Sequence, residues 1–229
     1  MATKKNSLQT GTPAWQRYSI WVILILTIVS TVALYVSSFL QTESNSEAQK
    51  KQSQVLKKYQ DYRKKVEEQA KELSVKYYDS FKEYEKAPVA FNAASVKELT
   101  KKDLKEGNGE EFTDSTTKFQ AYYIGWKPDG IVFDGSFENG RLKLPVVFRK
   151  EGKKWGLIEG WSEGLKGMKV GGIRELSIPA DKAYGAQGSV NQEDSSKTIG
   201  PNTPLKFIVM LIPEFQEIQQ PSLEENQND

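Results

Sequence analysis

The chain has 229 residues, with 32 Lys and Arg against 30 Asp and Glu, so its formal net charge is only +2. This near balance argues against nucleic acid as the main partner. The chain contains no cysteine and no histidine, which excludes disulfides, thiolate metal sites, cysteine nucleophiles, Ser-His-Asp triads and histidine acid–base catalysis. Any catalysis must therefore use carboxylates, hydroxyls, backbone dipoles, lysine or the shape of a pocket.

The N-terminal region has the pattern of a membrane anchor. Residues 1–17 contain basic but no acidic residues, and residues 18–42 contain no charged residue. About 20 apolar residues span a bilayer, so we expect a transmembrane helix over residues 18–40 that contacts membrane lipid. The positive-inside rule then predicts a cytoplasmic N-terminus at 1–17 and an extracytoplasmic remainder, that is, a single-pass protein of the cell membrane. A cleaved signal peptide is the alternative, although its apolar core is typically only about 7–15 residues long.

Residues 41–88 are predicted to form a helical stalk or linker, with one long helix over 44–86. Apolar and aromatic side chains from Tyr59 to Tyr84 recur at steps of three and four, the period of an amphipathic helix. Glu67 and Lys71 form an oppositely charged pair four residues apart, which favours a helix. Pro88 is expected to end it.

Three roles remain open for this helix. It can be a solvated stalk, it can pack on the domain that follows, or it can dimerise the protein as a coiled coil. Dimerisation through 44–86 is not favoured, because Arg63 and Ser80 interrupt the stripe and most of its members are tyrosines rather than leucines or isoleucines.

Residues 89–215 are predicted to form an α+β domain. One short helix is expected at "GWSEGLKGM", and short strands are bounded by Gly, Pro, Asn or Asp. The strand candidates are "TTKFQAYYIG", "GIVFDGS", "LKLPVVF", "GIRELSIP" and "LKFIVMLIP". The first of them alternates, with Phe119, Ala121 and Tyr123 on one face. The tail at 216–229 has too little apolar content to pack and is expected to be disordered.

Three segments in this domain carry a family resemblance. The stretches "YYIGWKPDGIVFDGS", "GLIEGWSEGLKGMKVGGIRELSIPADKAYGA" and "IGPNTPLKFIVMLI" resemble, in this order, the FKBP family of macrolide-binding peptidyl-prolyl cis/trans isomerases. The resemblance covers roughly residues 96–213. It implies an FKBP-like antiparallel β-sheet wrapped around a short α-helix, with an apolar pocket between them. It also implies proline-containing polypeptide substrates, a possible macrolide ligand, no metal and no cofactor.

The resemblance assigns roles to individual residues. The implied catalytic residues are Tyr123, Phe133, Asp134, Ile158, Trp161, Tyr184 and Phe207, and the implied substrate-binding residues are Leu142, Leu157 and Ile199. In this assignment Trp161 forms the pocket floor, the backbone N–H of Ile158 donates to a ligand carbonyl, and Leu142 replaces a wall aromatic. Gly160 and Gly164 are expected to let the short helix lie close to the sheet.

The function expected from the resemblance is isomerisation of X-Pro bonds in exported proteins, outside the cytoplasmic membrane, by an apolar pocket that favours the twisted amide. The alternative is a membrane-anchored module that binds proline peptides or acts as a chaperone with little turnover. The flap at 185–200 is longer than is usual in the family, which puts macrolide affinity in question.

Overall fold

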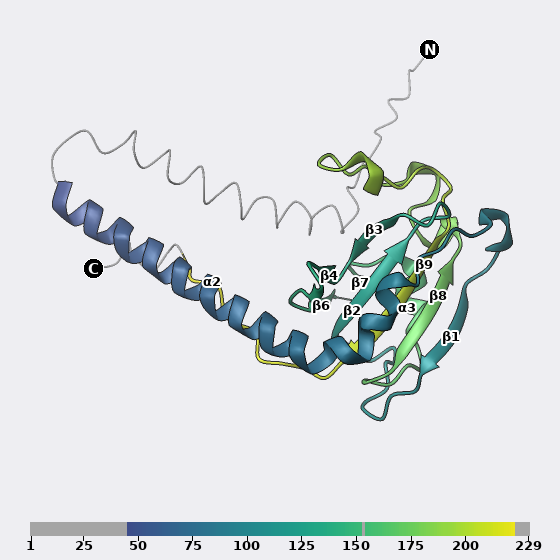
Figure 1. The fold of residues 1–229 in the computed structure, drawn as a ribbon, viewed down its shortest axis with the longest axis horizontal. Coiled ribbons are helices and arrows are strands. Elements are labelled where there is room, and N and C mark those ends of the chain that lie inside the picture. The colour runs from purple at the N-terminus through teal and green to yellow at the C-terminus, as the bar shows by residue number, and fades with distance from the viewer. Residues whose placement is uncertain (1–44, 153, 223–229) are drawn as a thin grey trace, which may run out of the picture. The chain divides into compact units, whose positions relative to one another are not determined.

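The computed structural model describes residues 45–152 and 154–222 (Figure 1). The chain divides into two compact units between Gln54 and Val55, and all packing considered below lies within the second unit. The anchor predicted at 18–40 falls outside the described residues. Within the described part of the chain, no helix combines the length and the apolar character that crossing a bilayer requires.

The long helix is present but ends earlier than predicted. Helix α2 (Asn45–Phe81) passes into a 3₁₀ turn at Lys82–Lys86 rather than continuing as α-helix to residue 86. Pro88 has no backbone N–H to donate, and its ring would clash with the carbonyl four residues earlier, so the helix cannot continue through it, although Ala87 still has helical angles (φ −70°, ψ −27°). The predicted stop at Pro88 is thus approached through a tighter last turn.

The last turns of α2 pack on the domain that follows, which confirms one of the three predicted roles for this part of the helix. Phe81 is fully buried, and its ring stacks on that of Phe137 with centroids 5.3 Å apart. Ser74 is also buried, and its hydroxyl accepts a hydrogen bond from the Leu142 N–H at 3.0 Å. The packed unit therefore begins before the predicted domain boundary at residue 89.

The domain is an antiparallel sheet with one short helix, as predicted. Strand order in the main sheet is β1-β8-β9-β2-β6-β7, and β3 pairs with the end of β2 that β6 does not reach; β4 and β5 form a separate hairpin (Figure 1). The strands are β1 (Thr100–Lys105), β2 (Lys118–Trp126), β3 (Val132–Gly135), β4 (Phe137–Glu138), β5 (Arg141–Leu142), β6 (Val146–Glu151), β7 (Lys154–Trp155), β8 (Ile173–Ile178) and β9 (Leu205–Ile212). The helix α3 (Glu159–Gly164) lies against β8 (Figure 1). Further 3₁₀ turns are Ala93–Ser95, Ala180–Lys182, Gly185–Gln187 and Ser195–Lys197.

Both faces of the central strands are buried. Phe119, Ala121 and Tyr123 of β2 face the cluster around α3, which confirms the predicted alternation. The other face of β2, with Tyr122 and Ile124, is buried as well, in a second cluster that contains Phe81 of α2. A strand covered on both faces carries a nearly continuous apolar sequence, and this accounts for the run "LKFIVMLI" in β9.

The tail departs from the prediction. Residues 216–222 are described and make defined contacts, whereas 223–229 fall outside the described residues. The Lys118 ammonium lies 3.1 Å from the Glu217 carboxylate, which also pairs with Arg149. The Gln69 side-chain amide donates to the Gln216 carbonyl at 2.6 Å. The prediction of disorder over 216–229 is therefore wrong for 216–222, because polar contacts rather than apolar burial hold this segment.

Candidate active site

Trp161 is the centre of an aromatic cluster on the α3 side of the sheet. Its side chain is 3% exposed and sits in the first turn of α3. Its ring stands nearly perpendicular to those of Tyr123 and Phe207, with interplanar angles of 88° and 87° and centroids 5.2 and 5.4 Å apart. Aromatic pairs prefer such edge-to-face contacts over stacked sandwiches. The indole is therefore fixed by the rings of two neighbouring strands.

Two glycines let α3 approach the sheet closely enough for this contact. A Cβ on Gly160 would lie 2.3 Å from Cγ2 of Ile178, and one on Gly164 would lie 2.8 Å from Cδ2 of Leu176. Both distances are shorter than nonbonded carbon atoms tolerate, so any side chain here would push the helix away. The predicted role of the two glycines is confirmed.

A third glycine, which the sequence analysis did not single out, makes room for the pocket wall. Phe133 on β3 meets Phe207 on β9 edge to face, with centroids 5.5 Å apart. Gly125 lies on β2 between them, and a Cβ there would come within 2.6 Å of the Phe207 ring and 2.9 Å of the Phe133 ring. Gly125 therefore shapes the wall by its lack of a side chain.

Asp134 lies at the rim, next to Tyr123. The buried Phe133 and the exposed Asp134 alternate along β3, as successive side chains of a strand do. The Tyr123 hydroxyl donates to Oδ2 of Asp134 at 2.5 Å, and the Gly135 N–H donates to Oδ1 at 2.8 Å. Ser136 pairs with the Tyr123 backbone in both directions, at 2.8 and 2.9 Å. The carboxylate therefore has a fixed orientation beside an apolar cluster.

The pKa values of both pocket tyrosines are raised. For Tyr123 the largest cause is burial of the hydroxyl, followed by the negative charge of Asp134 and the hydrogen bond to it. For Tyr184 burial again comes first and the Asp134 charge second. A tyrosine whose ionised form is disfavoured keeps its proton and remains a hydrogen-bond donor at neutral pH.

The remaining predicted residues border the same cluster, with one exception. Leu157, Ile158 and Tyr184 are half-buried against it, and Ile199 is a buried member. Ile158 caps the start of α3 in an extended conformation, with φ −62° and ψ 147°. The flap is held by two hydrogen bonds between Ser189 and Ile199, at 2.7 and 2.8 Å.

Leu142 is the exception, and its predicted place in the pocket is wrong. It is 1% exposed, but it belongs to the second cluster, on the opposite face of the sheet, with Phe81 and Tyr122. Shifting a strand by one residue turns every side chain to the other face, and the short hairpin of β4 and β5 offered no motif to fix the alignment. No wall of the pocket is formed by this leucine.

Comparisons with known proteins identify the family. A profile described as "FKBP-type peptidyl-prolyl cis-trans isomerase" matches residues 109–212. The "FK506-binding protein" of Neisseria meningitidis serogroup A is 35% identical over 114 residues, which cover 50% of this chain and 94% of that protein. The chain belongs to the FKBP family. It is an FKBP-type peptidyl-prolyl cis-trans isomerase, and the predicted enzyme class is confirmed.

Two further proteins are similar to part of this chain. The FKBP-type isomerase FkpA of Escherichia coli is 38% identical over 109 residues, covering 48% of this chain and 35% of that protein. The crystal structure of a peptidyl-prolyl cis-trans isomerase from Pseudomonas syringae pv. tomato is 32% identical and covers 50% of this chain and 74% of that one, with a TM-score of 0.40.

One pocket residue of this FKBP domain was missed by the sequence analysis. The Phe148 ring on β6 lies 5.3 Å from the Trp161 ring and stacks on Phe119 at 4.8 Å. The signal was present, because the strand "LKLPVVF" was predicted and ends in this phenylalanine.

Among the described residues, no three acidic side chains gather as metal ligands would.

Proposed function

We propose that this isomerase encloses the proline ring of its substrate among Trp161, Phe133 and Phe207, and that the amide twists in this apolar surrounding. The observation that carries the proposal is the cluster itself: one buried indole with two perpendicular rings and, at the rim, a carboxylate oriented by Tyr123. The resemblance to the family supports two further contacts with the substrate, from the Ile158 N–H and the Tyr184 hydroxyl.

The energetics of this mechanism are modest. Rotation about an X-Pro bond is opposed by amide resonance, whose barrier is about 18–20 kcal/mol. The planar amide has the larger charge separation, so an apolar, water-poor pocket destabilises it relative to the twisted state. A thousandfold acceleration requires only about 4 kcal/mol. No proton need pass to or from Asp134 or either tyrosine, because no bond to hydrogen changes in the reaction.

The direct test is isomerisation of a short, uncharged prolyl peptide by the full chain. Turnover well above the uncatalysed rate is expected, and Asp134→Ala is expected to lower kcat/KM while sparing the fold, because Asp134 is exposed. Background rates from the folded wild-type chain would overturn the proposal. So would full activity in a folded Trp161→Ala variant.

We also propose that the pocket accepts macrolides. Several relatives are named FK506-binding proteins, and the pocket aromatics assigned by the resemblance gather here. FK506 is expected to compete with the prolyl peptide, raising its apparent KM while leaving kcat unchanged. Inhibition that lowers kcat alone would place the macrolide elsewhere.

The proposed location is outside the cytoplasmic membrane, with exported proteins as substrates. The support is the sequence: basic residues at 1–17, then an uncharged stretch at 18–42. Protease added outside intact cells or spheroplasts is expected to digest residues after 42 and leave 1–17 protected. Complete protection of the isomerase domain would contradict this placement.

A further inference from the structure

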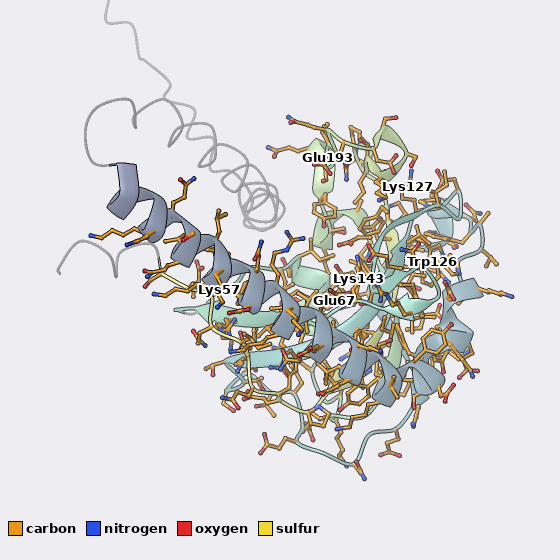
Figure 2. All side chains as sticks on the ribbon, turned by 60° about the vertical axis from the view of Figure 1, so that its left-hand side comes forward. Lys57, Glu67, Trp126, Lys127, Lys143 and Glu193 are labelled. Atoms are coloured by element: carbon orange, nitrogen blue, oxygen red, sulfur yellow. The ribbon has the colours of Figure 1, made fainter. Side chains whose placement is uncertain are left out.

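A groove of about 560 Å³ lies between α2 and the segment at residues 138–144, away from the aromatic pocket. Figure 2 shows Glu67 on α2 and Lys143 on the opposite wall near each other, and both line the groove. Apolar side chains contribute to the lining from both sides, among them Val66 and Leu144. The α2 wall runs from Gln60 to Lys71, which is about 18 Å of helix, or the length of about five extended residues.

The lining is predominantly basic. Five of its side chains are Lys or Arg and two are Glu. Arg63, Lys71, Arg141 and Lys143 form no ion pair within the described part of the chain, and the predicted Glu67–Lys71 pair is not made. Unpaired cations beside apolar surface favour a ligand that combines carboxylates with apolar groups.

The groove shares lining residues with a smaller hollow of about 280 Å³ on the same face of the sheet. Glu138 and Lys143 line both. Asp134, which the Tyr123 hydroxyl contacts at the rim, lines this smaller hollow. A polypeptide that leaves the aromatic pocket past Asp134 therefore meets Lys143 and then the groove along α2.

We infer that the groove binds an acidic, extended segment of the polypeptide substrate, which flanks the proline held in the pocket. The inference rests on the proposed function and names a substrate class for it. An open channel several residues long suits an extended chain better than a compact ligand, and its charge selects acidic sequences. Exposed ion pairs are weak singly and are screened by salt, so the groove is expected to tune substrate preference rather than determine turnover.

The test compares five substrates of the full chain at low ionic strength. One is a short, uncharged prolyl peptide. The other four carry a tail joined by a flexible spacer, in which apolar residues alternate with either acidic or basic residues. Each kind of tail is placed once before and once after the proline. The acidic tail is expected to lower KM about fivefold relative to the short peptide when it is attached on one side of the proline, since several weak ion pairs act together. This advantage should vanish in about 0.5 M salt, and the basic tail should give none.

Matched triple variants locate the effect. The groove variant combines Arg63→Gln, Lys71→Gln and Arg141→Gln, and it should lose the advantage of the acidic tail. The control variant combines Lys57→Gln, Lys65→Gln and Lys102→Gln, and it should keep this advantage. The control residues are exposed and do not line the groove. Both triple variants should turn over the short peptide as the wild type does, which separates a failure of the groove from a failure of the proposed function.

An acidic-tail advantage that is absent, or that survives in the groove variant, would overturn the inference. So would binding of phosphatidylserine vesicles that depends on the same three residues without any advantage of the acidic tail, because the groove would then face a lipid surface.

Discussion

Arg174 and Asp103 join the edge strand β1 to the end of the helix that carries Trp161. The buried guanidinium donates to both carboxylate oxygens of Asp103, at 2.5 and 3.0 Å. It also donates to the carbonyls of Gly164 and Lys166, at 2.9 and 3.0 Å. The last carbonyls of a helix lack partners within the helix. The Arg174 guanidinium supplies the missing donors at this end, so one side chain on β8 fixes α3 relative to the sheet.

Arg174→Met is expected to lower the free energy of unfolding by about 2–3 kcal/mol, because it leaves the buried Gly164 carbonyl without a donor and the Asp103 carboxylate without its partner. Since α3 then loses its anchor, kcat/KM should fall as well. Urea unfolding measures the first effect and the peptide assay the second. Lys102→Met, at an exposed site on β1, should change stability by less than about 0.5 kcal/mol. Equal stability of the two variants would contradict this role of Arg174.

Gly160→Ala sets two effects against each other. Alanine gains about 1 kcal/mol of helix propensity over glycine, whereas overpacking against the buried Ile178 costs about 1–3 kcal/mol. We expect net destabilisation and a displaced Trp161, visible as a changed tryptophan fluorescence. Gly200→Ala is the control, since its Cβ would meet only Thr203 at an ordinary 3.5 Å. A stabilised Gly160→Ala variant with normal fluorescence would show that the helix can withdraw freely.

Tyr123→Phe removes the hydroxyl that orients Asp134 and keeps the ring against Trp161. We expect kcat/KM to fall about tenfold, which corresponds to about 1.4 kcal/mol, with little change in stability because Asp134 remains hydrated. Tyr122→Phe is the matched control on the other face of β2. Within the described residues its buried hydroxyl has no hydrogen-bond partner, so its loss should leave activity unchanged and stability equal or higher. The reverse pattern would contradict the assigned roles.

Phe81→Ala is expected to destabilise the isomerase domain by about 3–5 kcal/mol, although it lies outside the predicted domain boundary, because a fully buried aromatic leaves a cavity. Val75→Ala, on the same helix at a residue that is 75% exposed, should cost less than about 0.5 kcal/mol. Calorimetric melting temperatures distinguish the two. A fragment that starts at residue 90 should melt below the full chain for the same reason.

The sequence predicted the α3 side of the fold well and the opposite side poorly. Trp161, Tyr184 and Phe207 lie in motifs with distinctive residues at fixed spacing. Each alone would be interpreted as a core residue, and their joint occurrence in family order allowed the assignment. Phe81 covers the second face of the sheet through a contact between segments far apart in the chain. An amphipathic stripe predicts that a helix packs on something, but it does not identify the partner. The stripe of α2 was recognised, but its partner surface on Tyr122 and Ile124 was not.

Two local errors have the same origin. Leu142 was assigned to the pocket and Phe148 was overlooked because the segment between β3 and α3 contains no motif that fixes its register. The backbone N–H of Leu142 donates to the hydroxyl of Ser74 in α2, a contact between segments far apart in the chain that the local sequence does not predict. Similarly, Glu217 is held by Lys118 and Arg149, a pairing that composition alone does not predict.

In the proposed mechanism, the pocket accelerates isomerisation through its environment and transfers no proton. The raised pKa values of Tyr123 and Tyr184 keep both hydroxyls protonated. A raised pKa means that folding favours the protonated form of each tyrosine. Their contribution to stability is therefore complete below the ordinary tyrosine pKa of about 10 and is lost as the pH rises through the higher folded-state values. Neither tyrosine titrates near neutrality.

The most direct measurement is kcat/KM for an uncharged prolyl peptide as a function of pH around neutrality, with the folded state checked at each pH. The proposed mechanism predicts a profile that is flat within about twofold from roughly pH 6 to 8, because the chain has no histidine or cysteine to titrate there. It also predicts equal rates in H₂O and D₂O after correction for solvent viscosity. A bell-shaped profile centred in that range, accompanied by a solvent isotope effect above about two, would contradict it, because a side chain would then act as an acid or base in the reaction.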